Sequence, residues 1–219
     1  MNDWLIWQIA DSAFPTGGFA HSFGLEAAWH LGEVDRASIR AFVRDAIGHA
    51  GRSALPFVTH AHAHPDEIAA IDDRCDVFLR SPVANRASRI QGRAWLATVE
   101  ASFPRPAVRD VCDRAHAQLA AKHHAVVFGA TLRALDVDQT SAQRLYLFGV
   151  CRGVASAAVR LGIVGTREAQ RIVGESGADL DRTLARCSSL EMDDAAQTAP
   201  LVELWQSRHD RLYSRLFQS

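Results

Sequence analysis

One stretch of the chain, residues 141–162, is apolar almost all the way round a helix, and this feature constrains the fold most. Its sequence, SAQRLYLFGVCRGVASAAVRLG, contains only three charged residues, Arg144, Arg152 and Arg160. A helix that is hydrophobic on every side belongs in the centre of a protein or in a membrane. Three arginines are too many for a span exposed to lipid. The stretch therefore predicts a central helix surrounded by other helices.

Small residues line one side of this predicted helix. Gly149, Gly153 and Ala157 stand four positions apart, so they share a face. Because small side chains let two backbones approach each other, this face allows the close approach of another helix.

Helical patterns fill the chain on both sides of the central stretch. After Asp35, apolar residues recur at three- and four-residue spacing, as on a helix with one buried face. The same spacing follows Pro65, Pro82, the breaker FPRP and Thr166, and no segment alternates as a β-strand would. Since 219 residues that are 48% hydrophobic can form one sizeable core, we expect an all-α single domain, a helical bundle, over residues 1–187.

The last part of the chain differs from this core. Residues 188–199 lose the helical period and gather three carboxylates, which predicts an exposed acidic connector. The period returns over residues 200–219, which predicts an amphipathic tail. Its apolar residues are Leu201, Trp205, Leu212, Tyr213, Leu216 and Phe217. Such a tail either docks on its own domain or binds a partner, and the pattern leaves both open.

Charge and cysteine usage exclude several classes of function. A formal net charge of -1 provides no basic field for a phosphate backbone, so we expect no nucleic-acid binding. The first residues, MNDWLIWQIADSAF, lack a basic region and meet Pro15 early, so we expect neither a secretory signal nor a membrane span, and a cytoplasmic protein. The four cysteines are far apart, without a CxxC pair, which predicts structural thiols. They are Cys75, Cys112, Cys151 and Cys187.

The stretch FPTGGFAHSFGLE places two glycines inside an apolar run. Gly17 and Gly18 after Pro15 predict a tight turn, because glycine adopts positive φ at little cost. The turn lacks the Lys-Ser or Lys-Thr of a P-loop and the GxGxxG spacing of a dinucleotide turn. His21 and Glu26 do not form a nucleophile and base with Ser22 if this segment is helical. We therefore expect no catalytic residues.

Two clusters of polar residues are candidates for binding. In the stretch HAHAH, a helix would place His60 and His64 on one face, where they could bind one nickel, copper or zinc ion. No carboxylate or thiolate at close spacing completes a site, so we favour a solvated face and no bound metal. The other cluster is a stripe of arginines at positions 86, 89 and 93, which we interpret as an exposed or ion-pairing face.

Four segments together resemble the UreF family of urease accessory proteins, in this order and over nearly the whole chain: ADSAFPTGGFAHSFGLEAAW, NRASRIQGRA, ASAAVRLGIVG and HDRLYSRLF. The Pro-x-Gly-Gly-Phe turn with the following Ser-x-Gly-Leu-Glu is the most specific of them. Phe14 stands where many members carry leucine. The resemblance implies an all-helical protein, usually a homodimer, without catalytic activity or a stably bound cofactor.

The resemblance also implies partners. A UreF protein bridges a scaffold of the UreD (or UreH) type and the GTPase UreG, and the assembly delivers nickel to apo-urease. The tail residues that would dock on the scaffold are Leu212, Tyr213, Arg215, Leu216 and Phe217. The residues that would face UreG or a second copy are Pro15, Gly17, Gly18, Phe19, His21 and Glu26. In this reading the glycine turn presents Phe19, His21 and Phe23 at the surface. The alternative is a metallochaperone that binds nickel itself through His60 and His64.

Overall fold

The computed structural model describes residues 3–218, and over this range the regular secondary structure is entirely helical, as predicted. The first six α-helices are α1 (Asp3–Ala10), α2 (Leu25–His30), α3 (Ile39–Ser53), α4 (Leu55–Ala63), α5 (Ile68–Phe78) and α6 (Pro82–Ser102). The other six are α7 (Pro106–Gln118), α8 (His124–Ala134), α9 (Gln139–Arg160), α10 (Thr166–Glu175), α11 (Gly177–Cys187) and α12 (Pro200–Arg208). Short 3-10 turns form η1 (Gly18–Ala20), η2 (Met192–Asp194) and η3 (His209–Arg211). Residues 1–2 of the expected core and residue 219 of the expected tail lie outside the described range.

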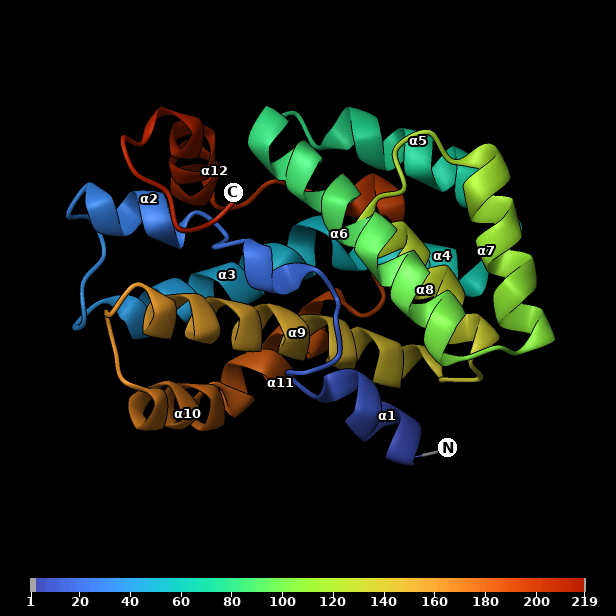
Figure 1. Ribbon diagram of the computed structural model, residues 1–219, viewed down its shortest axis with the longest axis horizontal. Coiled ribbons are helices and arrows are strands. Elements are labelled where there is room, and N and C mark those ends of the chain that lie inside the picture. Colours follow the sequence, from blue (N-terminus) through green and yellow to red (C-terminus); the bar gives the residue numbers. More distant parts are fainter. Residues whose placement is uncertain (1–2, 219) are drawn as a thin grey trace.

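Helix α9 is the central helix that the apolar stretch predicts. Figure 1 shows it crossing the middle of the molecule, and it packs against α3, α4, α10 and α11 as well as α1 and α2. Arginines on a central helix need polar partners, and two of the three find them in the N-terminal segment. Arg152 donates to the carbonyl oxygen of Ala10, and Arg160 donates to that of Phe19. The charges of α9 therefore fix the path of residues 10–20 across the helix.

The row of small residues on α9 accommodates a side chain at Gly153 and leaves open space at Gly149. The aromatic ring of Phe23 lies against Gly153, where an added Cβ would be 2.9 Å from ring atom Cε2. An added Cβ on Gly149 would meet nothing within 4 Å. The space left by Gly153 thus accommodates a side chain from the segment after the glycine turn.

A second layer packs α8 against α4 and α6, at the right of Figure 1. Trp95 of α6 is fully buried there, and its indole nitrogen donates to the hydroxyl of Thr131 at 2.8 Å. Gly92 lets α6 contact the segment before α8, since a Cβ on it would lie 1.8 Å from the carbonyl oxygen of Lys122. The hydrogen bond and this close contact together fix α6 against α8 within the second layer.

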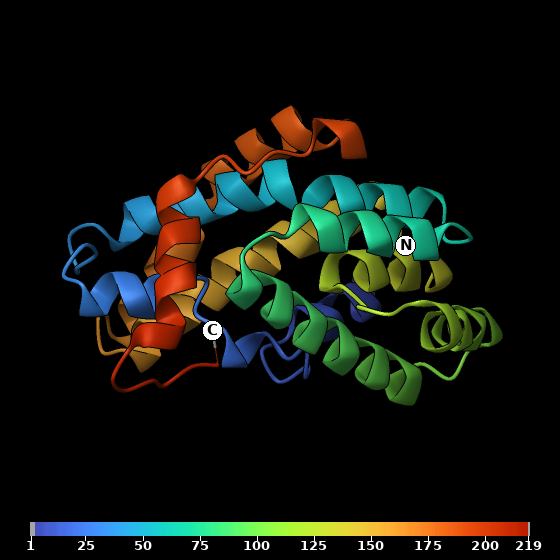
Figure 2. The same cartoon turned by 90° about the horizontal axis from the view of Figure 1, so that it is seen from above.

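The connector runs along the bundle from α4 and α5 to α12. Ala196 donates its amide to the carbonyl oxygen of Arg52 at 3.0 Å, and Asp193 pairs with Arg74, so the acidic connector is bound to α3 and α5. Figure 2 shows α12 lying beside α2, and it packs against α2 and α6.

Two further observations concern the predictions made from composition. All four cysteines are buried and unpaired, which confirms that they are structural thiols. Burial raises the pKa of the Cys112 thiol to about 11, so it is not a reactive thiolate at neutral pH. No helix among residues 3–218 combines the length and the apolar character needed to cross a bilayer.

Candidate functional site

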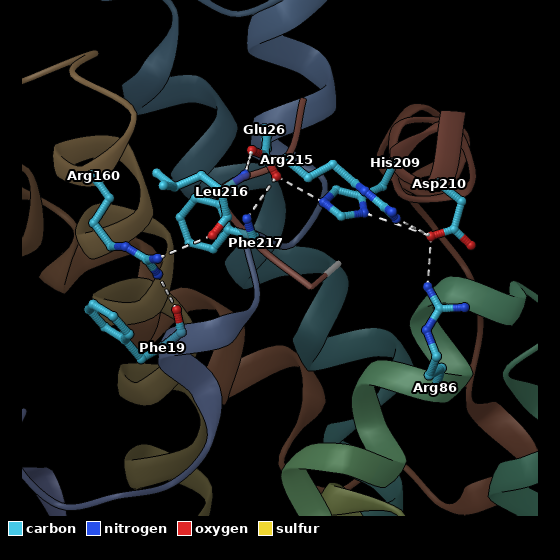
Figure 3. Close-up of polar contacts among 9 residues, drawn as sticks. All are labelled: Phe19, Glu26, Arg86, Arg160, His209, Asp210, Arg215, Leu216 and Phe217. Carbon is cyan, nitrogen blue, oxygen red and sulfur yellow. Dashed lines mark hydrogen bonds and ion pairs between the residues drawn. The ribbon is translucent and has the colours of Figure 1, made fainter. Parts of the chain in front are cut away.

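The tail folds back over the glycine turn and the start of α2, and we call this contact the tail junction. It joins residues 209–218 to residues 17–26, Arg86 and Arg160, which Figure 3 shows in close-up. The carboxylate of Glu26 is its centre. It accepts hydrogen bonds from His209 Nε2 at 2.8 Å, from the amide of Leu216 at 2.5 Å and from the amide of Phe217 at 3.2 Å. Glu26 is 1% exposed, so these donors replace the water that the carboxylate has lost.

Local backbone geometry places Glu26 at this point. Gly24 has a φ of +85° and precedes the first turn of α2. A Cβ on Gly24 would lie 3.1 Å from Cγ of Gln206 and 3.2 Å from the carbonyl oxygen of Val202, both in α12. Glycine therefore allows α12 to pack against the start of α2. The carboxylate two residues later then lies beside the end of α12.

Arg160 of α9 forms the second connection between the turn and the tail. Its guanidinium carbon lies 3.9 Å from the ring centroid of Phe19 and 4.1 Å from that of Phe217. It donates to the carbonyl oxygens of Phe19 and Leu216, the latter at 3.3 Å (Figure 3). Such cation–π contacts contribute on the order of 1 kcal/mol each, more when water is excluded. One side chain of α9 thus binds both segments at once.

Asp210 adds a third, more exposed set of contacts. Its carboxylate accepts from Arg86 of α6 at 2.8 Å and from Arg215 of the tail at 3.3 Å. The hydrogen bond from Arg86 is the main cause that lowers the pKa of Asp210 below its ordinary value. The ion-pairing role expected for the arginine stripe is therefore confirmed at Arg86.

The glycine turn rests on α6. Gly17 has a φ of +74°, and a Cβ on it would lie 2.9 Å from Cβ of Ala94. The hydroxyl of Thr98 donates to the carbonyl oxygen of Pro15 at 2.8 Å. Gly18 begins η1, which leads to Phe19. Both glycines therefore serve a tight turn that lies directly against a helix.

The turn does not present all of its side chains to solvent, which corrects one expectation. Phe19 is exposed, as expected, with 69% of its surface accessible. His21 is buried, and Phe23 packs against the core. Burial, with smaller contributions from His209 and Arg86, lowers the pKa of His21 to about 4, so its ring is neutral at pH 7. Glu26, which we expected toward the surface, is buried under the tail.

The tail is helical only in its first part. After α12 and η3, residues 212–218 run without regular structure, so the expected helical period is not continued. Phe217 is buried against the core, whereas Tyr213 is fully exposed and Leu216 is 52% exposed. Leu212 is half-buried, and Arg215 contacts Asp210. The tail therefore docks on its own domain and also offers apolar side chains to solvent.

Sequence reasoning missed three residues of this junction: Arg160, His209 and Asp210. His209 and Asp210 stand in the segment HDRLYSRLF, which drew attention as a whole, but nothing local singles out a histidine that becomes fully buried. In the sequence, Arg160 stands out only as a charged residue in an otherwise apolar helical stretch. A charged residue on an otherwise apolar helix is itself a signal, because its burial requires partners.

The histidines of HAHAH lie at the end of α4. The ring centroids of His60 and His64 are 4.7 Å apart, and His62 bonds to the carbonyl oxygen of Val137. Glu67 lies 3.9 Å from Nε2 of His60, and Glu191 lies 3.8 Å from its Nδ1. These carboxylates face opposite nitrogens of one ring, so they cannot join that ring around one ion. Among the described residues, no three His, Cys, Asp or Glu side chains are grouped to hold a metal.

Comparison with known proteins supports the resemblance to the UreF family. The family model of UreF matches residues 34–177. Urease accessory protein F of Oryza sativa subsp. indica is 34% identical over 98% of this chain and 84% of its own length. The protein of the same name from Arabidopsis thaliana is 35% identical over 99% of this chain and 92% of its own. Urease accessory protein UreF of Arthrobacter sp. (strain FB24) is 30% identical over 98% and 96%. The chain therefore belongs to the UreF family of urease accessory proteins.

Proposed function

We propose that this protein is a non-catalytic adaptor in urease maturation, which bridges a UreD/UreH-type scaffold and a UreG-type GTPase while nickel is delivered to apo-urease. It would act in the cytoplasm as a homodimer. Membership of the UreF family supports the general role. The observation that carries the bridging role is the tail junction, where the two segments expected to contact different partners touch each other.

The tail has the physical properties of a docking segment. Tyr213 and Leu216 are exposed next to the buried Phe217, whose amide donates to Glu26. The tail therefore offers apolar surface on a backbone that is hydrogen-bonded to the domain. A partner that covers these side chains gains apolar burial at about 25 cal/mol per Å². It also avoids part of the entropy cost of ordering a free chain.

The glycine turn provides the second surface. Phe19 is exposed and lies against Arg160, which also contacts Phe217. A partner that moves the tail therefore changes the contacts of Phe19, and a partner at Phe19 changes those of the tail. Such a shared contact is what allows two binding sites to influence each other's affinity. The GTPase and the scaffold would in this way sense each other through one adaptor.

Nickel is cargo of the whole assembly in this proposal, and the isolated chain holds no stable cofactor. The alternative, nickel binding by His60 and His64, predicts stoichiometric uptake that is lost on replacement of both. Titration of the isolated protein with nickel, followed by calorimetry, distinguishes the two. Stoichiometric, histidine-dependent binding would favour the metallochaperone.

Co-purification with each partner separately tests the bridging role. The double variant Tyr213→Asp with Leu216→Asp should lose capture of the UreD-type scaffold and keep capture of the UreG-type GTPase. Phe19→Asp should have the reverse effect. Val77→Asp is the matched control, because Val77 is 76% exposed on α5, away from the junction. If the intact, folded protein captures neither partner, the proposal fails.

A further inference from the structure

A second surface is formed by α3, α11 and α12. Its residues are not among those assigned to partner binding in the adaptor role. These helices enclose a groove of about 750 Å³. We call it the arginine groove, because four arginines line it. They are Arg44 and Arg52 of α3 and Arg182 and Arg186 of α11.

Positive charge in this groove is mostly unpaired. Arg182 pairs with Asp179 at 2.6 Å. The other three arginines make no ion pair with any carboxylate of residues 3–218, and all three are exposed. Asp45 is the second carboxylate in the lining, so four guanidinium groups face two carboxylates. This local excess contrasts with the formal net charge of -1 of the chain.

The wall opposite the arginines is apolar. Leu201 of α12 is 59% exposed, and Trp205 of the same helix also lines the groove. Trp205 rests on Phe42 of α3, with ring centroids 5.7 Å apart, so its position is fixed from behind. An incoming ligand therefore meets both guanidinium groups and apolar side chains.

We propose that the arginine groove binds an acidic segment of another protein, in which carboxylates alternate with large apolar side chains. The carboxylates would pair with Arg52 and Arg186, and the apolar side chains would lie on Leu201 and Trp205. Arginine matches carboxylate geometry with two parallel hydrogen bonds. The volume of the groove falls within the range of sites that enclose several side chains. This proposal does not depend on the adaptor role.

The lining favours a peptide over a nucleic acid. A phosphate backbone carries closely spaced charges and no apolar side chains. Asp45 and Asp179 would repel it, and the wall at Leu201 would stay uncovered. An acidic peptide with apolar side chains can cover both the arginines and the surface at Leu201.

Fluorescence anisotropy with a labelled peptide of alternating Glu and Leu residues tests the proposal on the full chain. The peptide should bind at low salt, and the same peptide with Gln in place of Glu should not. The double variant Arg52→Gln with Arg186→Gln should weaken binding by about tenfold, since two exposed ion pairs are lost. Arg109→Gln with Arg171→Gln is the matched control, because both are exposed arginines without an ion pair outside the groove.

Three outcomes would overturn the proposal. One is no binding of the acidic peptide by the parent protein. Another is an equal loss in both double variants, which would indicate attraction by overall charge. The third is tighter binding of a polyuridine oligonucleotide than of the acidic peptide. Leu201→Asp provides a further check, because it should weaken binding of the acidic peptide while leaving every arginine in place.

Discussion

Replacement of Glu26 by glutamine should release the tail while leaving the domain folded. The glutamate carboxylate accepts three hydrogen bonds, one from a histidine ring and two from backbone amides. A hydrogen bond to a charged group contributes about 1.5–3 kcal/mol. In Glu26→Gln, the amide oxygen still accepts, but the new NH2 group faces a donor. The remaining hydrogen bonds then go to a neutral acceptor instead of a carboxylate. We therefore expect the junction to lose about 3 kcal/mol.

The loss should be seen as local opening, because residues 209–218 can detach without unfolding the bundle. A change of about 3 kcal/mol raises the open fraction roughly a hundredfold. Hydrogen exchange of the amides of Leu216 and Phe217 measures this directly, since both donate to Glu26. Amides in the centre of α9 should exchange as in the parent protein.

Glu33→Gln is the matched control, because Glu33 is an exposed glutamate just after α2. It removes the same charge and should leave tail exchange unchanged. If the amides of Leu216 and Phe217 in Glu26→Gln exchange within about threefold of the parent rate, the carboxylate does not hold the tail, and the reasoning above is refuted.

Three further predictions concern the junction, the helix packing and the pH dependence. Arg160→Met removes both cation–π contacts and should lower the protection of the tail amides by about 1–3 kcal/mol, measured by the same exchange experiment. Gly92→Ala places a Cβ 1.8 Å from the Lys122 carbonyl oxygen and should lower the free energy of unfolding by at least about 3 kcal/mol. Gly174→Ala, where nothing lies within 4 Å, should raise it by up to about 1 kcal/mol; urea denaturation compares the two, and equal effects would contradict the packing. Burial lowers the pKa of His124 to about 4 from the ordinary 6.5, so folding requires the neutral ring, and stability should be full above pH 6.5 and fall as the pH drops toward 4. Urea midpoints across this range check it, and a His124→Phe variant should show a shallower loss.

The parts of the fold that the sequence predicts are those set by neighbours along the chain. Residues 141–162 predict the central helix, and α9 spans Gln139–Arg160. A helix that is apolar on all sides avoids water only when other helices surround it. The stripe after Asp35 predicts α3 for the same reason, since Ile39, Phe42 and Val43 are all buried.

The tail junction lies beyond such reasoning, because its contacts join residues far apart in the chain. The pattern of Leu212 to Phe217 predicts a continued helix, yet these residues run without regular structure. Glu26 accepts from the amides of Leu216 and Phe217, and Ala20 accepts from that of Gln218. Glu26, which the resemblance places toward the surface, is buried because the tail covers it, and its three donors stand 183 or more positions away in the chain. Local periodicity contains no information on partners at that separation.

The arrangement around Glu26 also constrains how this sequence can change over generations. Glu26 and His209 are both buried and hydrogen-bonded to each other, so a mutation at either position removes a hydrogen-bond partner from a buried polar group at the other. Single replacements at positions 26 and 209 should therefore be selected against, whereas paired replacements that remove both polar side chains should survive. Across many descendants of a common ancestor, the two positions are expected to vary together, although 182 residues separate them in the chain.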